Sequence, residues 1–273
     1  MLFSRDWERT ARGLQSVIAA GADPAAARFL TQLSEILARR HYPRPMRLVT
    51  WDLGCRTSGN RCPDRVIKAL VALEPDIVIL AQRLPEAARR ALLAALAEIG
   101  LKLQLAPRAG QRNGHVVVAS RLELVPGLLD AGTGSDDPPP NVLHAYAPTG
   151  ALDVLGLRMP DHACWDWLLH AAATLKHRRA VLIGDFDLDS NQERAGGLDH
   201  LQRLTQAGWR HAAPADGTAY RTADGHATRL DHAFLSPSLQ SIDARYALEA
   251  AGFRLAGTRD SLADQPALVV DLQ

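Results

Sequence analysis

Three aspartates follow an apolar run in the stretch AVLIGDFDLDS, which spans Ala180–Ser190. Asp185 comes directly after the run and its glycine, and Asp187 comes two positions later. Carboxylates gathered at the end of a strand are suited to a divalent metal, because Mg²⁺ and Mn²⁺ prefer hard oxygen ligands. A solvated acidic turn is the alternative, because aspartate and serine are common where a strand gives way to a loop.

Further aspartates lie beside other apolar runs. Asp52 follows RLVTW, and Asp264 precedes the last apolar run of the chain, PALVV. In open α/β sheets, ligands bind at the C-terminal ends of the strands. This favours one cavity for Asp52, Asp185 and Asp187, and our hypothesis adds Asp264 to it; a bound cation would offset the repulsion between their carboxylates.

The composition indicates a single large α/β domain without a strong overall charge. The chain has 273 residues, 47% of them hydrophobic, a net charge of +1 and a pI of about 7.9. This balance excludes a strong overall positive field, so nucleic acid binding would need a metal or a local basic patch. The three cysteines are odd in number and lack zinc-site spacing, and the sequence shows neither a signal core nor a membrane span. We expect a cytoplasmic protein with reduced thiols.

The order of helical and strand patterns predicts a layered structure. Residues 4–40 have helical periodicity and HYPRP follows as a linker, which predicts an N-terminal helical segment over 1–45. Strand, helix, strand and helix then alternate up to residue 100, as is typical of α/β layers. Short apolar runs between Gly, Pro, Asn and Asp predict antiparallel strands after that. We expect one domain over 46–273, with sheets covered by helices.

Six segments, taken in order, resemble the motifs of the endonuclease/exonuclease/phosphatase superfamily, which has a deoxyribonuclease-like fold. The resemblance covers Met46–Gln273. The matching segments are TWD, ending at Asp52; ILAQ, ending at Gln82; NGHVVVASR; GDFD, ending at Asp187; RLDH, ending at His232; and ADQ, ending at Gln265. The resemblance implies an α/β fold in which a two-layer β-sandwich is flanked by helices.

The resemblance also implies roles for individual residues. It implies a Mg²⁺ or Mn²⁺ cofactor, with metal ligands at Asp52, Gln82 and Asp264. The implied catalytic residues are Asp185, Asp187, Arg158 and Gln265. The implied substrate-binding residues are Tyr146, Arg229 and Asp231. For the last two the alternatives are structural: a salt bridge for the arginine, and orientation of a neighbouring group for the aspartate.

The chain departs from the family pattern at several of these positions. Gln82 stands where the family has a metal-binding glutamate, and Gln265 stands where it has a histidine. Asp52 and Asp187 both stand where it has asparagine. The carboxylate gained at Asp52 replaces the one lost at Gln82, so the metal site would keep its charge while that charge moves across it.

The family's inner histidine position is matched by Arg158, at the end of ALDVLGLR. In another register HAYAPTG matches the same motif, and Tyr146 becomes the phosphate contact. We prefer Arg158, because NVLHAYAP and ALDVLGLRM are suited to pairing as a hairpin. Neither arginine nor glutamine shuttles a proton at pH 7. Strand alternation would place Asp185 and Asp187 on one side, where the two carboxylates could share a proton and supply a base.

Two functions follow from this pattern. The first is a divalent-metal-dependent phosphoester hydrolase with a divergent active site, a nuclease or phosphodiesterase acting on nucleic acid. The second is a catalytically silent member of the fold that serves as a binding or scaffold module. Under either function the N-terminal helices could dock a protein partner or mediate self-association. DNA, RNA, lipid and small phosphoesters all remain open as substrates, because loops and not shared motifs set specificity in such a fold.

Overall fold

The structure is a computed structural model, and most of the expected domain is described in it. The described residues are 45–53, 62–81, 86–105, 116–127, 129, 141–159, 163–187, 197–214, 220–221, 227–257 and 260–273. The predicted N-terminal helical segment over 1–45 falls almost wholly outside these residues, as do Gln82 and its proposed metal contact. Both stay predictions.

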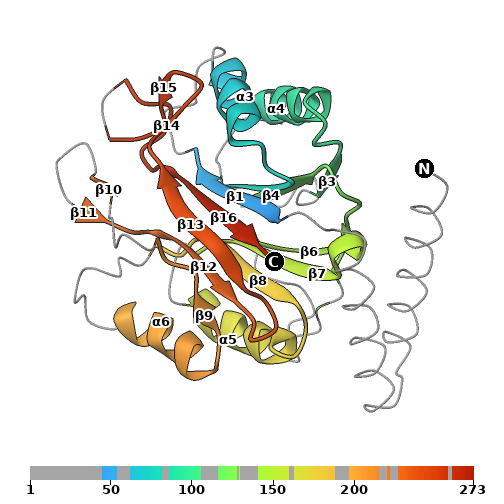
Figure 1. Ribbon diagram of the computed structural model, residues 1–273, viewed down its shortest axis with the longest axis vertical. Helices are drawn as coiled ribbons and strands as arrows, with labels where there is room; N and C mark the ends of the chain where they lie inside the picture. Colours follow the sequence, from blue (N-terminus) through green and yellow to red (C-terminus); the bar gives the residue numbers. More distant parts are fainter. Residues whose placement is uncertain are drawn as a thin grey trace.

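Two six-stranded sheets pack face to face, as the sequence predicted (Figure 1). The first sheet has the order β13 (Ser241–Ala247), β16 (Ala267–Leu272), β1 (Met46–Asp52), β2 (Ile77–Ala81), β4 (Val116–Ser120) and β3 (Leu103–Leu105). The second has the order β5 (Val125–Pro126), β6 (Val142–Ala147), β7 (Leu152–Arg158), β8 (Ala180–Asp185), β12 (Asp231–Leu235) and β9 (Arg210–His211). The predicted two-layer sandwich is therefore confirmed.

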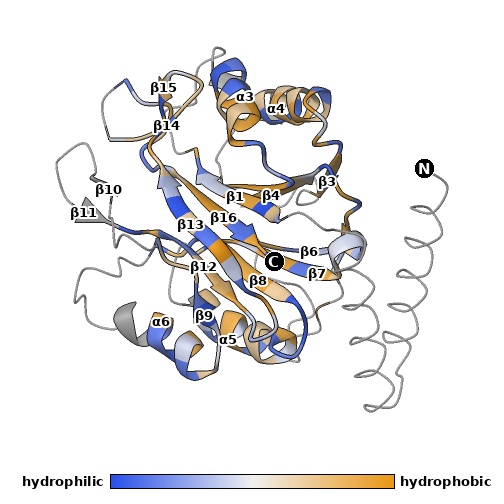
Figure 2. Ribbon diagram, viewed as in Figure 1, coloured by the Kyte–Doolittle hydropathy of each residue, from blue (hydrophilic) through white to orange (hydrophobic). Residues whose placement is uncertain are grey.

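Helices cover the outer face of each sheet. The helices α3 (Cys62–Leu73) and α4 (Glu86–Glu98) lie against the first sheet, and α5 (Ala163–Leu175) and α6 (Gly197–Gln206) lie against the second (Figure 1). Their apolar sides turn towards the sheets and their polar sides outward (Figure 2). A short 3₁₀ turn, η2 (Pro148–Gly150), joins β6 to β7. The remaining elements are two small hairpins, β10 (Tyr220–Arg221) with β11 (Ala227–Thr228) and β14 (Glu249–Ala250) with β15 (Phe253–Arg254), which the sequence pattern did not predict.

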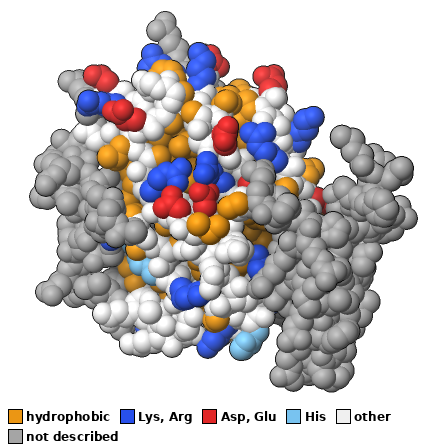
Figure 3. Space-filling model, viewed as in Figure 1, with side chains coloured by type: hydrophobic (Ala, Val, Ile, Leu, Met, Phe, Trp, Pro, Cys, Tyr) orange, Lys and Arg blue, Asp and Glu red, His pale blue; other side chains and the backbone are white. Residues whose placement is uncertain are grey.

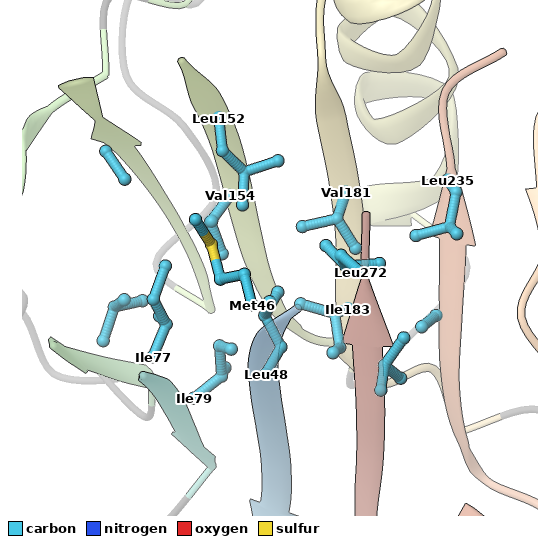
Figure 4. Packing of buried hydrophobic residues seen from close by; sticks show 14 of the residues in the cluster. Met46, Leu48, Ile77, Ile79, Leu152, Val154, Val181, Ile183, Leu235 and Leu272 are labelled. Atoms are coloured by element: carbon cyan, nitrogen blue, oxygen red, sulfur yellow. The ribbon is translucent and has the colours of Figure 1, made fainter. Parts of the chain in front are cut away.

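Side chains alternate along each strand, and this alternation builds three cores. Leu48, Ile79 and Ile183 belong to the cluster between the two sheets (Figure 4). Their neighbours Val49 and Trp51 point the other way, into the cluster under α3 and α4. Burying a side chain of this size contributes about 1.5–3 kcal/mol, so the register of each strand is strongly fixed. The same alternation decides which polar side chains enter the space between the sheets.

Two pairs of parallel strands determine where the ends of the strands lie. β1 runs parallel to β2, and β7 runs parallel to β8. The helices α3 and α5 lie in the connections between these strands. The pairing aligns Arg158, the last residue of β7, with Asp185, the last residue of β8. No helix in the described part of the chain is long and apolar enough to cross a membrane.

Candidate active site

Four polar side chains meet where the core between the sheets ends. Asp52 follows the inward-facing residues Met46 and Leu48 of β1 at even spacing, so its side chain points to the same side. The same reasoning turns the side chains of Arg158, Asp185 and Asp231 inward from β7, β8 and β12. On the second sheet both Arg158 and Asp231 pair with Asp185 in the strand register. One sheet therefore supplies three of the groups and the other supplies Asp52.

Arg158 lies between two of the carboxylates and links the two sheets. Its Nε atom is 3.5 Å from Oδ2 of Asp52 and 3.9 Å from Oδ2 of Asp185. Both distances exceed the 2.7–3.2 Å range of N–H···O hydrogen bonds, roughly stated. The buried Nε atom of Arg158 has no hydrogen-bond partner. The guanidinium therefore balances charge at this site while keeping at least one donor unused.

Burial and mutual repulsion perturb the carboxylates of this cluster. Asp52 and Asp185 are each 5% exposed, and Asp231 is 0% exposed. Burial, followed by the charge of Asp52, raises the pKa of Asp185 to about 8, against opposing effects of a backbone hydrogen bond from Asp187 and the charge of Arg158. Burial also raises the pKa of Asp231 well above its ordinary value, helped by Asp185 and Asp52. Such perturbed carboxylates are characteristic of functional sites.

Asp231 is the most exceptional of these groups. Both of its carboxylate oxygens are buried and have no hydrogen-bond partner. An unsatisfied buried polar group costs about 1–3 kcal/mol, and a charged one more, so such a group calls for a ligand or a proton. The hydroxyl of Thr50, two residues before Asp52 on the same face of β1, is likewise fully buried without a partner. The sequence assigned Asp231 only to substrate contact or orientation, and it gave Thr50 no role.

Asp187 lies beyond the end of β8, so strand alternation does not determine the direction of its side chain. β8 stops at Asp185, and Asp187 adopts a left-handed backbone conformation with φ 49°. Aspartate and asparagine tolerate that region better than most residues do. The backbone N–H of Asp187 donates to Oδ1 of Asp185 at 2.8 Å. The alternation argument therefore does not apply to Asp187, and the shared proton stays a prediction. Asp52 raises the pKa of Asp185 more than Asp187 does.

Gly184 allows β7 and β8 to approach closely just before the site. Its φ is 148°, and a Cβ atom there would lie 2.1 Å from the carbonyl oxygen of Leu157. Only glycine fits this position without displacing the neighbouring strand. The glycine of the GDFD segment thereby sets the separation of Arg158 from Asp185.

The segment with Asp264 and Gln265 lies beside the end of β1. The indole N–H of Trp51 donates to the backbone oxygen of Gln265 at 3.0 Å. The side-chain oxygen of Gln265 is buried and has no hydrogen-bond partner. Asp264 itself is exposed. This contact lies on the side of β1 opposite to the Asp52 side chain, and metal binding by Asp264 remains a prediction.

The other two proposed substrate contacts are Tyr146, which lies away from the four-residue cluster, and Arg229. Tyr146 pairs with Asp153, which is near the start of β7, whereas Arg158 ends that strand. The ring of Tyr146 lies 6.0 Å from the guanidinium carbon of Arg178. Arg229 lies near His211 and helps to lower the pKa of that residue. The register that made Tyr146 the phosphate contact is therefore not the one that forms this cluster, which contains Arg158.

A divalent cation fits the chemistry of the cluster. Three carboxylates and one guanidinium give it a formal charge of −2 when all are ionised, and one divalent ion would balance that charge. Mg²⁺ commonly takes one or two carboxylates and completes its shell with water. Among the residues that the structure describes, no group of three His, Cys, Asp or Glu side chains is arranged to hold an ion. Asp52 and Asp185, with water, are the set that fits.

Comparison with known proteins places the fold. No protein-family model matches this sequence, and no curated protein sequence matches it. Among solved structures, an endonuclease/exonuclease/phosphatase from Beutenbergia cavernae is 16% identical over 84% of this chain and 72% of its own, with a TM-score of 0.59.

Two further structures are of proteins named for action on DNA. The 3′ phosphatase NExo from Neisseria, bound to a product DNA hairpin, is 20% identical over 84% of this chain and 99% of its own, with a TM-score of 0.62. The endonuclease domain of a telomere-specific non-LTR retrotransposon is 11% identical over 84% of this chain and 98% of its own, with a TM-score of 0.58. At these identities the similarity shows the fold alone. The chain has the endonuclease/exonuclease/phosphatase fold.

Proposed function

From the endonuclease/exonuclease/phosphatase fold of this chain, we propose that the protein is a divalent-metal-dependent phosphoester hydrolase with a divergent active site, acting on nucleic acid. The observation that carries the proposal is the meeting of Asp52, Asp185 and Asp231 with Arg158 at the end of the sandwich, where buried carboxylates lack full neutralisation. The similar structures named for action on DNA support the choice of substrate.

The residues divide the work of hydrolysis among them. Asp52 and Asp185 would hold Mg²⁺ or Mn²⁺, which supplies charge neutralisation at the phosphate. Arg158 binds a phosphate oxygen through its free donors, as guanidinium groups commonly do. The N–H of Asp187 fixes one oxygen of Asp185 and so orients that carboxylate. Asp231, whose carboxylate oxygens have no hydrogen-bond partner, would position a water molecule or Asp185.

On the described surface, long-range charge would contribute little to the attraction of a polyanionic substrate. Acidic and basic side chains lie next to one another on the face shown in Figure 3. On the first sheet, for example, Arg47 pairs with Asp271 at 2.7 Å, and Asp271 lies 3.9 Å from Arg245. Such pairs cancel much of each other's field, so affinity for a polyanion would come from the metal and from Arg158.

An activity assay that compares the wild type with a metal-site variant tests the proposal. Wild-type protein and the Asp185→Ala variant would be assayed on plasmid DNA, single strands, abasic duplex and a chromogenic phosphodiester, with Mg²⁺ or Mn²⁺. We expect metal-dependent turnover by the wild type and its loss in the variant. An Asp271→Asn variant, outside the cluster, serves as the control and keeps activity. Equal activity in Asp185→Ala would contradict the proposal.

One observation favours the second function, a catalytically silent binding or scaffold module. Arg158 lies between Asp52 and Asp185, where it partly replaces a cation. Thermal unfolding distinguishes the two functions, because a ligand that binds only the folded state raises its apparent stability. A rise in melting temperature at millimolar Mg²⁺ supports the hydrolase. No rise, together with no turnover, supports the module.

Two parts of the proposal rest on the sequence alone. The proposed cytoplasmic location rests on the cysteine pattern, which favours reduced thiols. A partner-docking or self-associating role for residues 1–45 follows from their helical periodicity. Size-exclusion chromatography of the full chain and of a chain beginning at Met46 tests the second part.

A further inference from the structure

Two fully buried side chains near the cluster, Thr50 and Asp231, have polar atoms that make no hydrogen bond. Among the residues that the structure describes, neither the hydroxyl oxygen of Thr50 nor either carboxylate oxygen of Asp231 has a hydrogen-bond partner. Buried polar groups in proteins are, with few exceptions, hydrogen-bonded to protein or to ordered water. Two such groups that face the same space therefore indicate a ligand that they share.

The strand register turns the side chain of Thr50 into the space between the sheets. Thr50 of β1 pairs with Leu268 of β16, and Leu268 pairs with Tyr246 of β13. Residues that pair directly across strands lie on the same face of a sheet. Leu268 belongs to the core between the two sheets, so the side chains of Thr50 and Tyr246 also point into that space.

Asp231 faces Thr50 from the other sheet. The phenolic O–H of Tyr246 crosses between the sheets and donates to the backbone oxygen of Asp231 at 2.8 Å. Ala233 and Leu235 of β12 belong to the core between the sheets, so strand alternation turns the side chain of Asp231 towards the first sheet. Cα atoms of β1 and β12 come within 8 Å of each other. The hydroxyl of Thr50 and the carboxylate of Asp231 therefore border the same part of the space between the sheets.

The chemistry of the two groups matches a water molecule. An ionised carboxylate only accepts hydrogen bonds, whereas a hydroxyl both donates and accepts them. One water can donate to a carboxylate oxygen of Asp231 and accept from the hydroxyl of Thr50, which gives both groups a partner. Buried waters make about 2–4 hydrogen bonds to polar groups that would otherwise be unsatisfied.

We propose that Thr50 and Asp231 together bind one water molecule between the sheets, and that Thr50 is thereby a positioning residue for the neighbouring site. Asp231 pairs in register with Asp185, which is one of the two proposed metal ligands. Fixing Asp231 limits the orientations that are open to Asp185, and groups behind metal ligands commonly act in this way. The positioning role rests on the proposed hydrolase function, whereas the water site does not.

A crystal structure at high resolution tests the water site directly. We expect one ordered water within hydrogen-bonding distance of Oγ1 of Thr50 and of a carboxylate oxygen of Asp231. A direct hydrogen bond between these two side chains would overturn the inference. A site without an ordered water would overturn it as well.

Removing the hydroxyl tests the water site in solution. Thr50→Val exchanges the hydroxyl for a methyl group, and we expect it to lower the melting temperature by roughly 2–6 °C, because the water and Asp231 lose a partner. If Thr50 binds nothing, the substitution removes an unsatisfied polar group, and an unchanged or higher melting temperature would overturn the inference.

A second pair of variants separates the hydroxyl from packing. Thr50→Ser and Thr50→Ala both lack the methyl group and differ only in the hydroxyl. We expect Thr50→Ala to melt at a lower temperature than Thr50→Ser, for the same reason as before. Equal melting temperatures of these two variants would contradict the water site, even if Thr50→Val does not fold.

Kinetics on a chromogenic phosphodiester with Mg²⁺ test the positioning role. Changes behind metal ligands typically cost about 10–100-fold in activity or metal affinity, so we expect Thr50→Val to lower kcat about 10-fold or more, with KM within a few-fold. Thr50→Ser keeps the hydroxyl and should keep kcat within a few-fold of the wild type. Ser120→Ala is the matched control, because its buried hydroxyl donates to the backbone oxygen of Asp76 at 3.1 Å, at the other end of β2. It should lower the melting temperature and leave kcat unchanged.

The outcomes separate this inference from the proposed function. If the wild type hydrolyses no phosphoester, the proposed function fails and the positioning role falls with it, while the crystal structure and the melting temperatures still decide the water site. If Thr50→Val keeps the kcat of the wild type, the water is structural and the positioning role is overturned. If Ser120→Ala lowers kcat as much as Thr50→Val does, the loss reflects stability and the positioning role is likewise overturned.

Discussion

The raised pKa of Asp185 predicts that this carboxylate destabilises the metal-free protein. Its pKa rises from an ordinary 3.8 to about 8 in the folded state. The folded protein therefore holds a proton that the unfolded chain has lost, and this difference costs stability as the pH rises towards 8. At about 1.4 kcal/mol for each pKa unit, the full cost is on the order of 5 kcal/mol. This value is an upper limit, because Asp185 titrates as part of a cluster of interacting carboxylates.

Replacing Asp185 with asparagine should remove this cost. The amide is neutral at all pH values, nearly the same size, and its oxygen can still accept the 2.8 Å hydrogen bond from the N–H of Asp187. We expect Asp185→Asn to be more stable than the wild type at pH 8, by up to several kcal/mol, although it removes a functional group. A gain of this kind is the expected trade of stability against activity at a strained site.

Urea denaturation with a chelator present measures the effect. Between pH 6.5 and 8 the wild type should lose about 2 kcal/mol of unfolding free energy, and Asp185→Asn should lose clearly less. This window excludes His211, which is neutral in the folded state there because burial and His232 lower its pKa to about 3. The dependence of unfolding free energy on pH that remains in Asp185→Asn reports the raised pKa of Asp231.

A matched control substitution should change the free energy of unfolding in the opposite direction. Asp271→Asn removes a carboxylate that accepts two hydrogen bonds from Arg47, at 2.7 and 2.9 Å. We expect it to lower stability by about 1 kcal/mol at pH 8, since the pair is partly exposed. If Asp185→Asn were also less stable than the wild type at pH 8, the carboxylate would be satisfied in the folded protein and the reasoning about the cluster would be refuted.

Three further predictions concern other parts of the site. Gly184→Ala should cost more than about 2 kcal/mol, because its Cβ would lie 2.1 Å from the carbonyl oxygen of Leu157; an unchanged melting temperature would show that β7 and β8 can separate freely. Stability should fall as the pH drops from 6.5 towards 3, because the pKa of His211 is lowered to about 3; His211→Phe should reduce this fall in acid denaturation, and an identical acid profile would contradict a buried neutral imidazole. Mg²⁺ at 100 times its dissociation constant should stabilise the wild type by about 2.7 kcal/mol and Asp52→Asn by much less; equal shifts in melting temperature would place the ion elsewhere.

Strand ends and their alternation could be predicted from local sequence. Asp52 and Asp185 each follow an apolar run, and alternation along a strand turns each side chain to the same side as the residue two positions before it. The order of strands and helices likewise sufficed to predict two sheets covered by helices. Strands and helices depend mainly on residues that are close together in the sequence, so they can be predicted from it.

The limit of that reasoning is visible at Asp187. Alternation predicts that it faces the same side as Asp185, yet the backbone turns left-handed at φ 49° and its N–H group donates a hydrogen bond to the Asp185 carboxylate. The end of a strand depends on where its partners end, and β12 pairs with β8 only up to Asp185. No local pattern reports this.

The sequence alone determined the strands, the layered fold and the presence of carboxylates at strand ends. Only the tertiary structure decided that Arg158 lies between Asp52 and Asp185, and that the carboxylate of Asp231 is fully buried without a hydrogen-bond partner. These contacts join β1 of one sheet to β7, β8 and β12 of the other, more than 100 residues apart along the chain in the case of Asp52 and Arg158. The physical reason is that the separation of two sheets is set by how their apolar side chains pack, and packing is a property of the whole core.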